Sequence, residues 1–236
     1  MRKKNIYTKQ KPGEFSQKKA GRIPALSPIS VHDYLREIGK KWKGLGYAME
    51  LGSWFGATAV PLLEGLVAAE YTLPFYSWDR WKANDEQVTR AAEFGVKIVK
   101  NQDLKPLFEE NVNKVYDQIV SIKGDIVKNL KWTQGPIEIC IFDAPKLPEV
   151  FGPCIERLTP HFIPGVTIFG LLDYYFWERH HKGGADKTHK LRVPDRFINY
   201  HRESFTLLKH WRNKCSCAFF RYEGGAVWED MDKWLM

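Results

Sequence analysis

The segment Tyr47–Thr58 constrains the fold of this chain more than any other segment. A short apolar run ends around an acid, Glu50, and a turn with two glycines four positions apart, Gly52 and Gly56, follows it. A new apolar segment then begins, so the order is strand, glycine-rich loop, helix. Such a loop lets a ligand lie against bare backbone at a helix N-terminus. Glycines in a strand-to-helix turn also serve the backbone alone, so both interpretations stay open at this point.

Apolar runs and helical patterns alternate along the rest of the chain. Predicted helices cover about residues 31–42, 58–70, 85–94, 104–122, 149–158 and 195–201. Predicted strands cover about residues 47–51, 72–77, 96–99, 137–142, 165–172, 205–211 and 218–222. This alternation, followed by a hairpin, predicts an α/β, Rossmann-like, doubly wound fold. We expect a mostly parallel seven-stranded sheet with a C-terminal antiparallel hairpin.

Acidic residues fall at the ends of the predicted parallel strands. They are Glu50 within the first strand, Asp79 after the second, Asp103 after the third, Asp143 after the fourth and Asp173 after the fifth. In open parallel sheets, ligands bind outside the carboxyl ends of the strands. Scattered solvated acids have no reason to follow strand ends, so this row of acids predicts a ligand site along that edge.

The sequence resembles the class I S-adenosylmethionine-dependent methyltransferases, and among them the small-molecule and sugar O-methyltransferases of the macrocin and catechol types. The segment Glu50–Gly56 is similar to the first motif of that family, and Tyr76–Trp81 resembles the end of the second strand in the sugar type. The order of acid and glycines differs from the dinucleotide fingerprint G-x-G-x-x-G. The resemblance covers about residues 45–222. It implies an enzyme that transfers a methyl group from S-adenosyl-L-methionine to a hydroxyl of a small molecule or sugar.

The resemblance also implies a set of cofactor-binding residues. Asp79 would accept hydrogen bonds from the ribose diol, as carboxylates do in dinucleotide sites. Asp103, with Gln102 beside it, would bind the adenine, and Glu50 would lie near the methionine amino group. Trp81 would either stack on the adenine or pack in the core. The full set is Glu50, Gly52, Ser53, Gly56, Asp79, Trp81, Gln102 and Asp103.

The same resemblance implies catalytic residues and a metal site. Cation-dependent members of the family hold a divalent metal on carboxylates after the fourth and fifth strands, with a lysine three residues past the first of them. Asp143, Lys146 and Asp173 match this pattern. By resemblance, Asp143 and Asp173 would bind Mg²⁺ or another divalent cation, and Lys146 would be the general base. Tyr174, directly after Asp173, departs from the family pattern, so metal use stays open, and His181 is an alternative base.

The positive charge of the chain is concentrated at its N-terminus. The formal net charge is +8, and residues 1–28 carry eight Lys or Arg against one Glu. We expect these residues to form a disordered basic tail able to contact nucleic-acid phosphates. Residues 29–236 would form a single methyltransferase domain. Within it, residues 178–192 would be a polar lid, and the aromatic run 174–177 would line the acceptor pocket.

Two other function classes stay open. A methyltransferase acting on the ribose or bases of a nucleic acid would use the basic tail, and a non-catalytic methyltransferase-like protein would keep the fold alone. Enzymes that methylate exocyclic base amines carry an Asp/Asn-Pro-Pro-aromatic motif after the fourth strand. This chain has Asp143–Lys146, Asp-Ala-Pro-Lys, at that place. The difference disfavours base methylation but not ribose methylation.

The remaining features bear on location and partners. Four cysteines without metal-ligand spacing indicate reduced thiols, which predicts a cytoplasmic protein. The longest apolar run, residues 162–172, is too short to cross a bilayer, and the N-terminus lacks a secretory signal. We therefore expect no membrane span. The identity of the acceptor and the formation of a homo-oligomer stay open.

Overall fold

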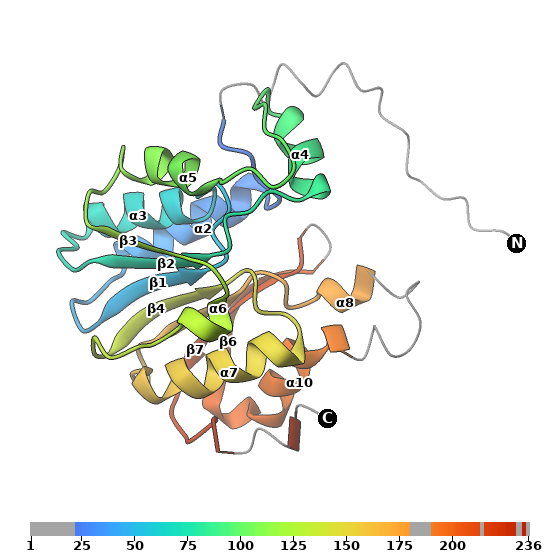
Figure 1. Ribbon diagram of the computed structural model, residues 1–236. Helices are drawn as coiled ribbons and strands as arrows, with labels where there is room; N and C mark the ends of the chain where they lie inside the picture. The colour runs from blue at the N-terminus through green and yellow to red at the C-terminus, as the bar shows by residue number, and fades with distance from the viewer. Residues whose placement is uncertain (1–21, 180–189, 213–214, 230–232, 235–236) are drawn as a thin grey trace, which may run out of the picture.

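The computed structural model describes residues 22–179, 190–212, 215–229 and 233–234. A seven-stranded sheet with the order β3-β2-β1-β4-β5-β7-β6 forms its centre (Figure 1). The strands are β1 (Tyr47–Leu51), β2 (Phe75–Asp79), β3 (Ile119–Lys123), β4 (Ile137–Phe142), β5 (Ile168–Leu171), β6 (Phe205–Trp211) and β7 (Cys217–Tyr222). Neighbours among β1 to β5 are parallel, and β7 pairs antiparallel with both β5 and β6. The predicted doubly wound sheet with a C-terminal hairpin is confirmed.

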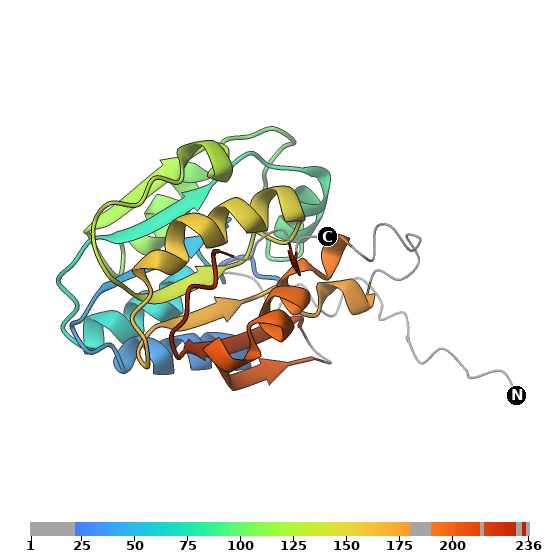
Figure 2. The same ribbon diagram turned by 90° about the horizontal axis from the view of Figure 1, so that it is seen from below.

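Helices cover both faces of the sheet, as Figures 1 and 2 show. One face carries α2 (Ile29–Lys40), α3 (Ala59–Ala68) and α5 (Lys105–Val112). The other face carries α6 (Ile126–Asn129), α7 (Pro148–Leu158) and α10 (Val193–Tyr200). Two helices follow strand ends at the carboxyl edge of the sheet, α4 (Asp85–Ala92) and α8 (Phe176–Arg179). Two short 3₁₀ turns are η1 (Thr159–His161) and η3 (Arg202–Ser204).

The central strands bury both of their faces. In β1, Ala48 belongs to the apolar cluster that includes α2 and α3, and its neighbour Met49 belongs to the cluster that includes α7 and α10. In β4, Ile141 and Phe142 divide between the two clusters in the same way. Successive side chains of a strand point to opposite faces. A strand covered on both sides therefore reads as a continuous apolar run, which is why the sequence revealed these two strands.

Glu138, the charged residue within β4, has a structural role. Its side chain is 3% exposed, and its two carboxylate oxygens accept hydrogen bonds from the backbone amides of Lys43 and Leu45. These amides belong to the turn between α2 and β1. A buried carboxylate needs such partners. Glu138 therefore fixes the turn before β1 to the neighbouring strand.

The structure corrects the position of the third strand. Residues 96–99, predicted as a strand, form a loop, and the predicted helix 104–122 ends at Val112, before β3. A run of four apolar residues has too little periodicity to distinguish a strand from a loop. Here the amide of Val96 closes the end of α4 on the carbonyl of Ala91 at 3.1 Å, and Val99 is 68% exposed. The actual β3 is an edge strand, half-buried for most of its length, so it has no continuous apolar run.

Two predicted boundaries fall partly within the described residues. Of the predicted tail, residues 22–28 lie against the domain, with Pro24 buried and Ile23 packed on the core, while residues 1–21 lie outside the described residues. Of the predicted lid, residues 178–179 belong to α8 and residues 190–191 are helical. Residues 180–189 lie outside the described residues. In the described part of the chain, no helix has the length and apolar character needed to cross a membrane.

Two glycines let α2 and α3 approach through their backbones. A Cβ added at Gly39 would lie 2.5 Å from the carbonyl oxygen of Leu62, and one at Gly65 would overlap the carbonyl of Arg36. Such distances leave no room for a methyl group. This contact holds α2 on the core, together with the segment 22–28 that precedes it.

Replacing Gly65 with alanine should therefore destabilise the fold by about 3 kcal/mol, because the added methyl forces two helix backbones apart. Urea unfolding monitored by circular dichroism measures the change. Gly95→Ala is the matched control: nothing lies within 4 Å of its added Cβ, and its φ of +77° predicts a cost of only about 1 kcal/mol. An equal loss in both variants would contradict the close-contact explanation.

Candidate functional site

The glycine-rich loop between β1 and α3 is shaped by contacts within the protein. Gly52 has a φ of +95°, and a Cβ there would lie 2.5 Å from the backbone nitrogen of Ala144, after β4. Gly56 has a φ of +85°, and its Cβ would lie 3.1 Å from the side chain of Val112 in α5. Positive φ and close approach both require glycine. The fold thus explains these glycines without a ligand, and the adjoining acids must carry the argument for a site.

Asp79, the last residue of β2, ties this loop to the turn after β2. One carboxylate oxygen accepts hydrogen bonds from the backbone amides of Ser53 at 2.8 Å and Trp54 at 2.9 Å. The other oxygen accepts from the amide of Trp81 at 2.6 Å. A carboxylate offers about four acceptor positions, so these amides leave about one for an incoming hydroxyl. Asp79 thus lies where the resemblance predicts a ribose ligand. A ribose diol would have to share the acceptor positions of this carboxylate with the backbone amides of the loop.

Glu50 lies buried beneath the loop, 1% exposed. One of its carboxylate oxygens accepts a hydrogen bond from the hydroxyl of Thr58, and the other, Oε2, has no partner. Burial raises the pKa of Glu50 to about 7, against the lowering effect of the hydroxyl groups of Thr58 and Ser53. Buried polar atoms in folded proteins are nearly always paired. The unpartnered oxygen therefore fits a site that receives a cationic or hydrogen-bonding group.

Lys146 and Asp173 form an ion pair where β4 and β5 end. The Lys146 ammonium lies 2.5 Å from an Asp173 carboxylate oxygen and 4.5 Å from the centre of the Phe176 ring. Burial lowers the pKa of Lys146, but the charge and hydrogen bond of Asp173 and the charge of Asp143 outweigh it and leave the pKa raised. Lys146 is therefore an ammonium group at neutral pH.

Asp143 follows β4 and faces the same ammonium. Burial has the largest effect and raises the pKa of Asp143 well above the ordinary value. The negative charges of Asp173 and Glu50 raise this pKa further, and the positive charge of Lys146 lowers it. Four acids, including Asp79, thus influence one another at the carboxyl edge of the sheet. The sequence prediction that acids gather there holds for these four.

The donor set does not fit a dedicated divalent-cation site. Among the described residues, no group of three or more His, Cys, Asp or Glu side chains is placed to hold a metal ion. Asp143 and Asp173 supply two carboxylates, and the Lys146 ammonium already occupies an oxygen of one of them. A second cation beside that ammonium would be repelled.

Asp103 and Gln102 occupy a different setting from the predicted one. Asp103 precedes α5 instead of following a strand, and its carboxylate pairs with Lys123 at 2.6 Å. Lys123 is the last residue of β3 and lies beside Asp79 in the sheet register, so Asp103 still reaches the carboxyl edge. The hydrogen bond from Lys123 lowers the pKa of Asp103. Gln102 accepts from the amide of Val99 at 3.0 Å and closes a local turn.

A further predicted residue, Trp81, is buried away from the site at the carboxyl edge. Trp81 is 1% exposed, packs 4.9 Å from the ring of Phe108, and donates its indole N–H to the Trp54 carbonyl at 2.9 Å. It is a core residue here, which is the second of the two interpretations given above. His181 lies outside the described residues.

Sequence reasoning missed Asp125, the acid that follows the true third strand. It comes after Gly124, which has a φ of +131°, and its carboxylate caps α6 by accepting from the amide of Lys128 at 3.2 Å. The signal was the alternating segment 119–123 before a Gly-Asp pair. The misplaced strand at residues 96–99 concealed it.

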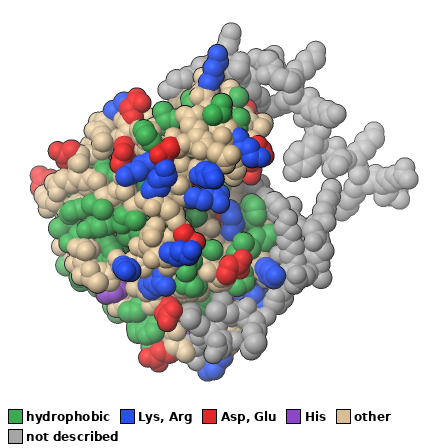
Figure 3. Space-filling model, viewed as in Figure 1, with side chains coloured by type: hydrophobic (Ala, Val, Ile, Leu, Met, Phe, Trp, Pro, Cys, Tyr) green, Lys and Arg blue, Asp and Glu red, His purple; other side chains and the backbone are tan. Residues whose placement is uncertain are grey.

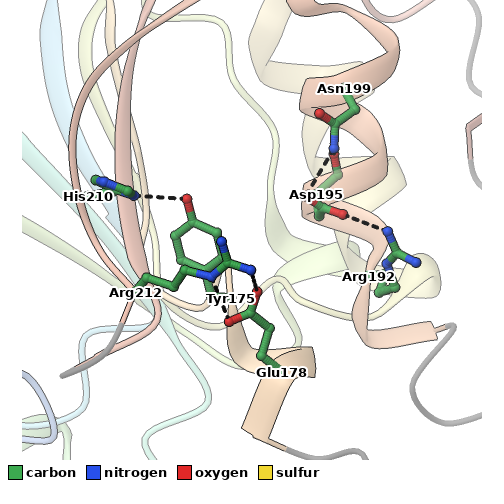
Figure 4. A network of polar contacts seen from close by, with 7 residues as sticks. All are labelled: Tyr175, Glu178, Arg192, Asp195, Asn199, His210 and Arg212. Atoms are coloured by element: carbon green, nitrogen blue, oxygen red, sulfur yellow. Dashed lines mark hydrogen bonds and ion pairs between the residues drawn. The ribbon is translucent and has the colours of Figure 1, made fainter.

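A polar network borders the aromatic segment after Asp173 (Figure 4). The Tyr175 hydroxyl lies 3.0 Å from Nδ1 of His210. Arg212 donates two hydrogen bonds to the Glu178 carboxylate, at 3.0 and 2.5 Å, and lies over the Tyr175 ring. A neighbouring group consists of Arg192, Asp195 and Asn199. The contacts of His210 and Arg212 join α8 and the residue before it to the β6–β7 hairpin, and only the tertiary structure reveals them, whereas those of Asp195 are local to α10.

Comparisons with known proteins add the fold relationship. No family model matches the sequence, and no curated protein matches it. Solved structures do match. The O-methyltransferase NovP aligns with a TM-score of 0.57 at 15% identity, over 85% of this chain and 83% of NovP. An O-methyltransferase from Bacillus cereus in complex with SAH aligns with a TM-score of 0.54 at 14% identity, over 85% and 83%. The TDP-rhamnose 3′-O-methyltransferase CalS11 aligns with a TM-score of 0.53 at 16% identity, over 83% and 78%.

The chain has the fold of these methyltransferases. In this methyltransferase fold, the buried Glu50 and the Lys146–Asp173 pair lie at the carboxyl ends of β1, β4 and β5, where open α/β sheets bind ligands. The fold and the chemistry of the edge therefore point to the same part of the molecule.

Replacing Glu50 with glutamine should stabilise the protein at pH 8 and have little effect below pH 4.5. The folded-state pKa of about 7 lies above the ordinary 4.5, so the folded state binds the proton more tightly. The proton on Glu50 therefore stabilises the wild-type protein. This stabilisation, about 3 kcal/mol, is complete below pH 4.5 and is lost as the pH rises through 7. Urea unfolding at the two pH values measures it. Glu156→Gln, on the exposed surface of α7, should change neither value by more than about 0.5 kcal/mol. A difference in stability between Glu50→Gln and the wild type that is the same at both pH values would refute the raised pKa of Glu50.

Proposed function

We propose that this protein is an S-adenosylmethionine-dependent methyltransferase that methylates a hydroxyl oxygen of a small molecule or sugar. One observation carries the proposal: a buried carboxylate with an unpartnered oxygen, Glu50, lies beside Asp79, Asp143 and the Lys146–Asp173 pair. Proteins of the same fold include O-methyltransferases, one of them acting on TDP-rhamnose. A fold alone hosts many functions, so the site must support the reaction.

The residues at this edge fit the methyl donor. When bound, S-adenosylmethionine supplies an electrophilic methyl group on a sulfonium. The Glu50 carboxylate would hold the donor's amino group, Asp79 a ribose hydroxyl, and Asp103 with Gln102 the adenine. The acids at this edge also suit a donor that carries positive charge. The loop glycines, Gly52 and Gly56, would shape the backbone on which the donor rests.

Asp143 and Lys146 would prepare the acceptor hydroxyl. The Lys146 ammonium, held by Asp173, would stabilise negative charge that develops on the acceptor oxygen. Because Lys146 keeps its proton, we assign proton acceptance to the Asp143 carboxylate, whose burial makes it a stronger base than an ordinary aspartate. Asp143 would take the hydroxyl proton as the acceptor oxygen receives the methyl group, and the donor sulfonium, losing its bond to that methyl carbon, would leave as the thioether S-adenosylhomocysteine. His181 remains the alternative base from the sequence prediction.

The cysteines and the surface charges bear on the location and the partners of the protein. The four cysteines are buried and none of them forms a disulfide bond, which supports a reducing compartment, the cytoplasm. On the face shown in Figure 3, basic and acidic side chains are interspersed, so that face has no separate basic surface for nucleic acid. Nucleic-acid contact through residues 1–28 and a homo-oligomer stay predictions.

Isothermal calorimetry with S-adenosylmethionine tests donor binding. Replacing Asp79 with alanine should weaken binding at least about 30-fold, because charge-assisted hydrogen bonds to a ribose are worth about 2 kcal/mol. Asp117→Ala, an exposed acid before β3, should bind like the wild type. If the wild-type protein shows no heat of binding, the proposed function fails.

Replacing Lys146 with methionine should lower kcat about 100-fold while leaving donor affinity unchanged, since the charge acts on the acceptor oxygen. Release of S-adenosylhomocysteine measures the rate, with acceptors screened among sugar nucleotides and phenols, beginning with TDP-rhamnose. Lys114→Met, at an exposed position in the turn after α5, is the control. A chelator should leave the wild-type rate unaltered, because the described residues offer no third ligand beside Asp143 and Asp173. A Lys146→Met rate equal to the wild type would remove this residue from the mechanism.

A further inference from the structure

A cavity of about 690 Å³ lies between the segment 22–29, the first turns of α2 and α3, and the end of α4. Figure 1 shows the segment before α2 beside α4, at one side of the molecule. A smaller cavity of about 340 Å³ adjoins it and shares Arg22, Ile23 and Phe94 in its wall. Sites for small molecules commonly measure about 300–1,000 Å³. We call the two together the N-terminal cavity.

Apolar side chains form much of the wall of the N-terminal cavity. Ile23, Val60 and Phe94 contribute to it from three separate elements. At its rim, Leu26 and Ile29 are 59% and 58% exposed, which is high for large apolar residues. Concave apolar surface of this kind suits a ring or a hydrocarbon chain.

Arginines converge on the same cavity. Arg36 is neutralised by two acids, Asp33 and Glu64. Arg90 shares one of its nitrogens with Glu93 at 2.9 Å and keeps the others for further contacts. Within the described residues, Arg22 has no acid partner. Arg22 and Arg90 therefore offer a positive end to an otherwise apolar cavity.

The N-terminal cavity adjoins the site at the carboxyl edge. Ala57, in its wall, belongs to the loop after β1, and the next residue, Thr58, binds the buried Glu50. On the other side, Glu86 in the first turn of α4 lies close enough to raise the pKa of Lys146, and the last turn of the same helix lines the cavity. A molecule in the cavity would thus reach toward the residues proposed for methyl transfer.

The aromatic segment after Asp173 is less suited to receive an acceptor. The Tyr175, Phe176 and Trp177 rings each have a cation over one face, at 5.4, 4.5 and 4.6 Å from the ring centres. These contacts occupy surfaces on which an acceptor ring would stack. The N-terminal cavity has open apolar walls instead.

We propose that the N-terminal cavity binds the methyl acceptor and selects an amphipathic anion, with an apolar ring or chain against Val60 and Phe94 and a negatively charged group at Arg22 and Arg90. The proposal rests on the proposed function for its assignment to the acceptor. Dye binding tests the existence of the binding site independently of that assignment.

The dye 1-anilinonaphthalene-8-sulfonate, an apolar ring system with an anionic group, is the probe for the cavity. Its fluorescence should report one saturable site on the full chain in the presence of S-adenosylhomocysteine. Val60→Trp should weaken this binding at least about tenfold by filling the cavity. Val67→Trp lies two turns further along α3, at an exposed position outside the cavity, and should bind like the wild type. Equal binding by the two variants, or no saturable site in the wild type, would overturn the proposal.

Arg90→Gln provides a second variant that does not depend on fitting a larger side chain. It should weaken dye binding about fivefold and reduce its dependence on salt, because one ionic contact is lost. Lys114→Gln, which removes an exposed cation in the turn after α5, should change neither property. An unchanged affinity in Arg90→Gln would refute the anionic contact.

Transfer of a labelled methyl group to a small-molecule extract of the source cells tests the assignment to the acceptor. Val60→Trp should lose transfer while its affinity for S-adenosylmethionine, measured by calorimetry, stays at the wild-type value. Transfer at the wild-type rate in this variant would overturn the assignment. Absence of donor binding in the wild type would instead refute the proposed function, and the dye experiment would still decide whether the cavity binds an amphipathic anion.

Discussion

The carboxylate of Asp79 holds together the part of the molecule on which the site depends. It accepts hydrogen bonds from three backbone amides, two in the loop after β1 and one in the turn after β2. Charge-assisted bonds to backbone amides are among the stronger hydrogen bonds in proteins. They fix the ends of two neighbouring strands relative to each other. The loop in turn packs against Ala144 after β4, so the ends of three strands share one framework.

This framework brings several carboxylates together at the carboxyl edge of the sheet, where burial disfavours their charged forms. Glu50 and Asp143 both have raised pKa values, chiefly because burial disfavours their charged forms. Lys146 is the nearby positive charge that offsets part of the repulsion. Elsewhere in the sheet the buried carboxylate of Glu138 is fully paired with backbone amides. Glu138, with both oxygens paired, supports the fold, whereas Glu50 and Asp143, with raised pKa values, are candidates for binding a ligand.

Several elements were readable from the sequence because their patterns are local. β1 and β4 are apolar runs followed by turn residues, and both were placed within a residue of their actual bounds. Glu50 and Asp143 follow from those two strands, and Asp79 and Asp173 from the ends of the predicted second and fifth strands. The third strand was misplaced because an edge strand with half-buried residues lacks the apolar run that marks a central strand. That error carried Asp103 into the wrong setting and left Asp125 unnoticed.

The sequence by itself determined the alternation of strands and helices, the acids at the edge and the resemblance to methyltransferases, since each depends on residues close together in the chain. Only the tertiary structure decided how those residues are used. It placed Trp81 in the core, paired Lys146 with Asp173, and made a cavity from the segment before α2 and the end of α4. Burial, ion pairing and concavity arise between segments far apart in sequence, and no local pattern records which of them meet.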